Sequence, residues 1–120
     1  MRFPTLATIT AALLLVLGLH GQSAAASSSQ IDCKVGPVTK TYGGTKWLVY
    51  SCNDNRSLVI VSAPDSPASP FYFLFSSENG EYHLHGEGTG DKAATDAAYK
   101  DLGTLSESDI TNLIVETKKR

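Results

Sequence analysis

The sequence predicts an α+β domain in which a five-stranded antiparallel β-meander is followed by two C-terminal α-helices packed on one sheet face. Three observations support this fold class. Short apolar segments alternate with turn-forming residues between positions 31 and 86, as in a series of hairpins. Residues 91–102 are rich in alanine, with apolar residues at helical spacing. Residues 106–117 begin with a capping motif and continue with a second helical pattern.

The first two predicted strands form a hairpin. Residues 31–41 are poor strand material, and they contain Pro37, which has no N–H to donate to a neighbouring strand. This segment is therefore expected at a sheet edge. Gly43 and Gly44 predict the turn, because glycine readily adopts the positive φ that tight hairpins require. The second strand covers residues 47–52.

The remaining strands follow the same pattern of apolar segment and turn. Asparagine and aspartate in residues 53–56 favour a turn, as do Asn79 and Gly80 in residues 77–80. A loop with three prolines, at positions 64, 67 and 70, separates the third strand from the fourth. The predicted strands are residues 58–61, 71–75 and 81–86.

Pairing across the predicted turns decides which residues share a sheet face. A four-residue loop at residues 77–80 places Phe75 opposite Tyr82 and Tyr72 across from His85. Across the central turn, Tyr50 is expected opposite Val59. One face of these strands then carries Leu48, Tyr50, Val59 and Val61, and the other carries Trp47, Val49, Leu58 and Ile60.

The central strands are thus apolar on both faces, whereas a half-exposed antiparallel sheet alternates apolar and polar residues. Two short helices cover only one face well. Two explanations remain open for the other face: the N-terminal segment and the proline loop cover it, or it is a docking surface for a partner or a second copy.

The ends of both helices are marked in the sequence. Asp91 or Thr89 is predicted to cap the first helix, and Gly103 is predicted to end it in a left-handed conformation. Ser106 is expected to cap the second, with Asp109 completing a capping box. The predicted apolar faces are Ala94, Ala97, Ala98 and Leu102 in the first helix, and Ile110, Leu113, Ile114 and Thr117 in the second.

The N-terminus is typical of a secretory signal peptide. Arg2 is followed by an apolar run at residues 6–19 and by small residues at 23–26. The run is shorter than the roughly twenty residues that span a bilayer, which favours a cleaved peptide over an anchor. The predicted division is a cleaved signal peptide at 1–26, a disordered lead-in at 27–30 and a single small domain at 31–120. We expect a periplasmic or secreted protein, of bacterial origin, with no membrane span after cleavage.

The two cysteines of the chain, Cys33 and Cys52, predict a disulfide, because an even number of cysteines in an exported protein usually pairs. Closing a loop of about 20 residues stabilises a fold by roughly 3 kcal/mol in the chain-entropy model. The absence of a Cys-x-x-Cys spacing argues against a redox or metal site.

The sharpest chemical signal is the pair His83 and His85. Residues two apart in a strand point the same way, so these imidazoles and Glu87 are expected on one face. Two imidazoles and a carboxylate can bind Zn²⁺ or Cu²⁺. The alternative is that these are the outward polar residues of an edge strand whose Tyr82 and Leu84 face the core.

Other function classes receive little support. No serine stands in a nucleophile-elbow motif, so no catalytic residue is predicted. The formal net charge is −2 and the only basic run is residues 118–120, which argues against nucleic-acid binding. Asn55 begins an N-glycosylation sequon that matters only in a eukaryotic secretory pathway.

The sequence therefore predicts a small exported, non-catalytic binding or interaction domain without a cofactor. Its sheet would carry the interface, anchored by Trp47, Tyr72 and Leu74, because aromatic residues dominate such surfaces. The alternatives are a metal-binding protein or metal-dependent hydrolase that uses His83 and His85, and a purely structural envelope component.

Overall fold

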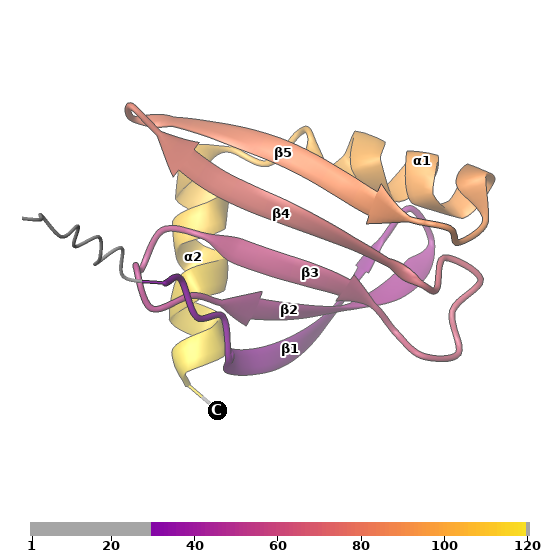
Figure 1. The fold of residues 1–120 in the computed structure, drawn as a ribbon, viewed down its shortest axis with the longest axis horizontal. Coiled ribbons are helices and arrows are strands. Elements are labelled where there is room, and N and C mark those ends of the chain that lie inside the picture. The colour runs from indigo at the N-terminus through magenta and orange to yellow at the C-terminus, as the bar shows by residue number, and fades with distance from the viewer. Residues whose placement is uncertain (1–29, 120) are drawn as a thin grey trace, which may run out of the picture.

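Five strands and two helices follow one another along the chain in the predicted order (Figure 1). The computed structural model describes residues 30–119, so the predicted signal peptide lies outside the described residues. The strands are β1 (Val35–Tyr42), β2 (Thr45–Ser51), β3 (Leu58–Ser62), β4 (Phe71–Glu78) and β5 (Glu81–Gly88). The helices are α1 (Lys92–Leu102) and α2 (Glu107–Lys118). The predicted α+β fold is confirmed.

The strands form one antiparallel sheet in the order β1-β2-β3-β4-β5, and the helices lie on one side of it (Figure 1). Strand β1 is an edge strand, as Pro37 predicts, and its pairing with β2 shifts between Val35 and Val38. Among residues 30–119, no helix has the length and apolar composition that crossing a membrane requires.

The core lies between the sheet and the helices. It is built from alternate residues of β2, β3 and β4 and from the inner faces of α1 and α2, as the helical spacing predicts. The buried members include Trp47, Val49, Leu58, Ile60, Phe73, Phe75, Ala98, Leu102, Ile110, Leu113 and Ile114. The indole Nε1 of Trp47 donates hydrogen bonds to Thr45 Oγ1 at 2.9 Å and to the carbonyl of Tyr42 at 3.2 Å, so its polar atom is satisfied.

The pairing of β4 with β5 differs from the prediction. Asn79 and Gly80 have φ values of 53° and 82° and form a two-residue turn, so Glu78 pairs with Glu81. Two residues with positive φ are the requirement of a type I′ hairpin, for which Asn-Gly is the favoured sequence. The predicted four-residue loop is therefore wrong.

The shorter turn moves every pair along the strands by two residues. Phe75 lies opposite Leu84 rather than Tyr82, and Tyr72 lies opposite Glu87 rather than His85. The predicted sharing of faces survives, because a shift of two residues keeps each side chain on its side of the sheet. At the central turn, the predicted pairing of Tyr50 with Val59 is confirmed.

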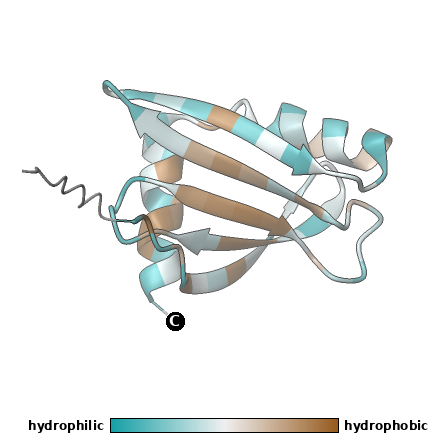
Figure 2. Cartoon of the chain, viewed as in Figure 1, coloured by the Kyte–Doolittle hydropathy of each residue, from teal (hydrophilic) through white to brown (hydrophobic). Residues whose placement is uncertain are grey.

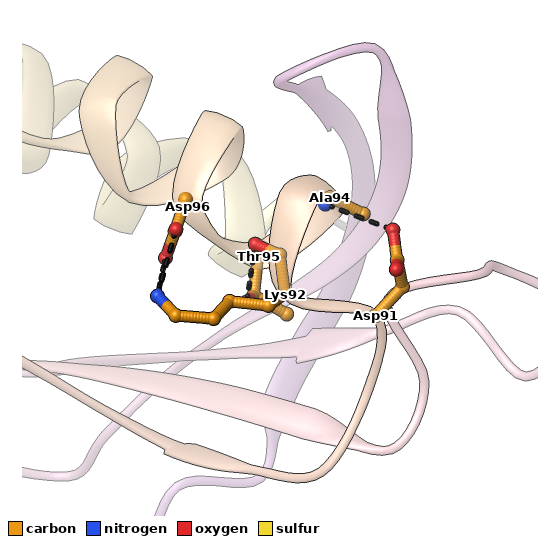
Figure 3. A network of polar contacts seen from close by, with 5 residues as sticks. All are labelled: Asp91, Lys92, Ala94, Thr95 and Asp96. Carbon is orange, nitrogen blue, oxygen red and sulfur yellow. Dashed lines mark hydrogen bonds and ion pairs between the residues drawn. The ribbon is translucent and has the colours of Figure 1, made fainter.

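Helix α1 begins at the predicted cap, with the carboxylate of Asp91 accepting a hydrogen bond from the N–H of Ala94 at 3.2 Å (Figure 3). Across the first turn of the helix, Lys92 and Asp96 form an ion pair at 2.8 Å. Gly103, however, has φ −66°, so the predicted left-handed ending is wrong. The chain instead continues in right-handed turns, in which the N–H of Leu105 bonds to the carbonyl of Leu102.

Helix α2 begins with the predicted capping box. The Ser106 hydroxyl accepts a hydrogen bond from the N–H of Asp109 at 3.0 Å, and the Asp109 carboxylate accepts one from the N–H of Ser106 at 2.8 Å. These bonds lower the pKa of the Asp109 carboxyl. Such reciprocal capping satisfies two backbone donors that the helix itself leaves unpaired.

The turn between β1 and β2 sits directly against α1. Gly43 has φ +59°, and a Cβ at this position would lie 2.4 Å from the backbone nitrogen of Ala98. The N–H of Gly43 donates a hydrogen bond to the Asp101 carboxylate. Glycine is therefore required here for both its backbone conformation and its size.

The predicted disulfide between Cys33 and Cys52 is present, and it ties the segment before β1 to the end of β2. Beside it, the N–H of Asn53 donates to the carbonyl of Asp32 at 2.8 Å, and the N–H of Asp32 donates to Asn53 Oδ1 at 3.1 Å. The described N-terminal residues therefore run along the β2–β3 turn, at one end of the sheet.

Candidate functional site

The sheet face turned away from the helices carries a continuous apolar surface, which we call the open face. Figure 2 shows the hydrophobic residues of β2, β3 and β4 in front, with no helix before them. The apolar side chains of this face are Leu48, Tyr50, Val59, Val61, Tyr72 and Leu74. They alternate along each strand with the buried core residues, as the pleat of a sheet requires.

Strand pairing arranges the open face in two parallel rows that cross the sheet. Each row starts with apolar residues on β2, β3 and β4 and ends with a polar residue on β5. One row is Leu48, Val61, Tyr72 and Glu87, and the other is Tyr50, Val59, Leu74 and His85. The open face is therefore apolar in its centre and polar along the β5 edge.

Internal cover, one of the two open explanations, is limited among residues 30–119, where Pro70 of the proline loop borders the face beside Val59 and Val61. The described N-terminal residues lie at the β2–β3 turn. Pro67 of the same loop lies beside the start of α1, where the N–H of Asp91 bonds to its carbonyl at 3.0 Å. Tyr72 remains 39% exposed, and the other apolar side chains of the face are half-buried by their neighbours.

An open groove of 530 Å³ lies at one end of the open face, where β4 begins and β5 ends beside β3. Its lining is mostly apolar and comes from all three strands and from the residues that flank β4 and β5. The lining residues are Val59, Val61, Pro70, Phe71, Tyr72, Glu87, Gly88 and Thr89.

A hydrogen-bonded cluster stands at the β5 side of the groove. The Tyr72 hydroxyl donates to Glu87 Oε2 at 3.2 Å, and His85 Nε2 lies 3.2 Å from the same oxygen. The hydrogen bonds from His85 and Tyr72 lower the pKa of the Glu87 carboxyl. The bond to Glu87 raises the pKa of the Tyr72 hydroxyl in turn. Glu87 is therefore ionised at neutral pH, and Tyr72 is neutral.

The predicted metal ligands occupy the same exposed edge. His83, His85 and Glu87 are exposed side chains on the open face of β5, with His83 opposite Ser76. The structure brings His85 and Glu87 into contact. Within the part of the chain that the structure describes, no three His, Cys, Asp or Glu side chains gather closely enough to hold a metal ion. Metal binding by this set stays a prediction.

The three predicted anchor residues do not lie on the same face of the sheet. Tyr72 and Leu74 lie on the open face, beside one another in neighbouring rows. Trp47 is fully buried on the helix side, where the centroids of its ring and the Phe73 ring are 5.2 Å apart. Trp47 is therefore a core residue that a partner cannot reach, and its assignment as an anchor is corrected. The sequence pattern already places Trp47 on the same sheet face as Val49, which is also fully buried.

Sequence reasoning missed the contact between Tyr72 and Glu87 and the groove beside it. Both depend on the β4–β5 register. The Asn79-Gly80 dipeptide was the available signal, since it favours a two-residue turn and that turn places Glu87 opposite Tyr72. The contribution of Pro70 to the groove depends on tertiary structure that no local pattern predicts.

Comparison of the chain with protein-family models, with curated proteins and with solved structures gave no match.

Proposed function

We propose that this protein is a small exported, non-catalytic binding domain whose open face receives a protein partner. The observation that carries the proposal is the pair of apolar rows on β2, β3 and β4, on the sheet face that neither α1 nor α2 covers (Figure 1). Contiguous apolar surface that remains in water is typical of interaction sites. Export is supported by the signal-like N-terminal sequence and by the disulfide, which persists in oxidising compartments.

The open face has the layout of an interface. Its apolar centre contains Tyr72, an aromatic residue that is exposed and whose polar atom already has a partner. Such residues contribute strongly to binding when a partner covers them. The β5 edge adds His83, His85 and Glu87 as a polar rim. A polar rim around an apolar centre is the usual anatomy of protein–protein interfaces.

The test compares Leu74→Lys with Val115→Lys. Leu74 lies in the centre of the open face, whereas Val115 is an equally apolar side chain, 45% exposed, on α2. Each variant places one charge on an apolar surface position. Crosslinking in the source envelope, followed by identification of the bound protein, measures partner capture. We expect Leu74→Lys to abolish the crosslink and Val115→Lys to retain it, with unchanged circular dichroism for both.

Light scattering on the same proteins distinguishes a partner from a second copy. A dimer that Leu74→Lys dissociates would assign the open face to self-association. Equal behaviour of the two variants, in capture and in mass, would contradict the proposal and leave a purely structural role in the envelope.

The alternative function is metal binding at His83 and His85. The shared exposure of these imidazoles and the contact of His85 with Glu87 favour it. Titration of chelator-stripped protein with Zn²⁺ and Cu²⁺ tests it. An affinity that the double substitution His83→Ala, His85→Ala leaves unchanged would rule it out.

A further inference from the structure

The groove on the open face has the size and the composition of a small-ligand site. Its 530 Å³ falls within the range of about 300–1,000 Å³ that such sites occupy. Val59, Val61 and Pro70 supply apolar walls, and Tyr72 supplies an exposed aromatic ring. Small-molecule sites typically combine a lining of this kind with a few polar groups that fix the orientation of the ligand.

The charge at the groove has one sign. Of the lining residues, Glu87 is the only one that is ionised at neutral pH, and no lysine, arginine or histidine lines the groove. Both hydrogen bonds to its carboxylate, from Tyr72 and His85, reach Oε2. Among the described residues, no hydrogen bond or ion pair reaches Oε1, so this oxygen remains available to a ligand.

The negative charge of Glu87 selects among ligands of the same shape. A neutral apolar ligand that covers the groove removes part of the Glu87 carboxylate from water without replacing that solvation, which costs free energy. A cationic group on the same ligand compensates this cost by pairing with Glu87. The cation also lies near the ring of Tyr72, whose face attracts positive charge. An anionic group is repelled.

We propose that the groove binds a small organic cation, in which an ammonium group is attached to an apolar or aromatic body. The apolar body lies against Val59, Val61 and Pro70, and the ammonium pairs with Glu87 beside the Tyr72 ring. This inference rests on the proposed role of the open face as a binding surface and adds the chemistry of one ligand.

Three probes of similar size and different charge test the proposal: 4-phenylbutylamine, 4-phenylbutanol and 4-phenylbutyrate. Each is titrated into the isotope-labelled protein, and binding is followed by NMR. We expect the amine to bind about twofold to fivefold more tightly than the alcohol, the range that an exposed ion pair provides. The butyrate should bind most weakly. The signals that shift should be those of Val59, Val61, Gly88 and Thr89.

Matched variants assign the charge preference to one residue. Glu87→Gln should make the affinities for amine and alcohol equal. Glu81→Gln removes an exposed carboxylate from the same face of β5, outside the groove, and should leave the preference unchanged. Tyr72→Ala should weaken the binding of the amine and the alcohol, because it removes the aromatic wall.

Several results would overturn the proposal: no binding of any probe, equal affinities for amine and alcohol, shifts outside the groove, or the same response of Glu87→Gln and Glu81→Gln. A blocked Lys-Phe dipeptide that binds more tightly than the amine would assign the groove to a basic protein segment instead. Because Leu74 does not line the groove, the Leu74→Lys experiment tests the protein-partner function separately, and each idea can fail alone.

Discussion

At the scale of single residues, Tyr42 has the most strongly altered titration of the described side chains. Burial, together with the nearby carboxylates of Glu116 and Asp109, raises the pKa of its hydroxyl to about 12. An unfolded tyrosine titrates near pH 10. The ionised form is therefore favoured in the unfolded chain, so the stability of the fold should decrease as the pH rises from about 10 to about 12.

We expect the Tyr42→Phe variant to lose the highest step in an absorbance titration of the five tyrosines. Its stability should also decline less between pH 10 and 12 than that of the unaltered protein, as measured by urea unfolding. Tyr99→Phe is the control, since this tyrosine is half exposed on α1. A high step that persists in Tyr42→Phe would contradict the assignment.

At the scale of elements, a buried pair of hydroxyls joins β2 to α2. Ser51 Oγ and Thr117 Oγ1 lie 2.6 Å apart, and both side chains are almost fully buried. The Thr117 hydroxyl donates its proton to the carbonyl of Ile114 at 2.6 Å, so Ser51 donates to Thr117. Thr117→Val should cost about 1–3 kcal/mol, because it leaves the buried Ser51 hydroxyl without an acceptor.

The double variant Ser51→Ala, Thr117→Val removes both hydroxyls, so it should lose clearly less stability than the sum of the two single variants. Urea unfolding of the four proteins gives this coupling directly. Simple additivity would mean that the hydroxyls do not interact across the interface.

At the scale of the whole molecule, the Cys33–Cys52 disulfide holds the start of the domain to the sheet. It spans 19 residues, so removing it should lower the free energy of unfolding by about 3 kcal/mol in the chain-entropy model. Unfolding of the Cys33→Ser, Cys52→Ser variant measures this loss. Addition of a reductant should destabilise the unaltered protein and leave the variant unaffected. An equal response of both proteins to the reductant would contradict a structural role for the bond.

Across the whole molecule, the sequence predicts the features that depend on neighbouring residues, but not those that depend on distant ones. The Gly43-Gly44 turn, the Ser106 capping box and the buried faces of both helices depend on neighbouring residues, so local patterns predict them. The β4–β5 register depends on the length of the turn at Asn79 and Gly80, and the predicted four-residue loop is wrong there. The groove needs three strands and Pro70 in their final places, which local patterns do not specify.

The alternation along the central strands has an evolutionary consequence. In β3, Leu58 and Ile60 are fully buried against the helices, while Val59 and Val61 face the other way. Selection for stability acts mainly on the first pair, whereas under the proposed function selection for recognition would act on the second. The open face can therefore diverge at every second position while the buried face stays the same, so related chains can acquire different ligands without acquiring a different fold.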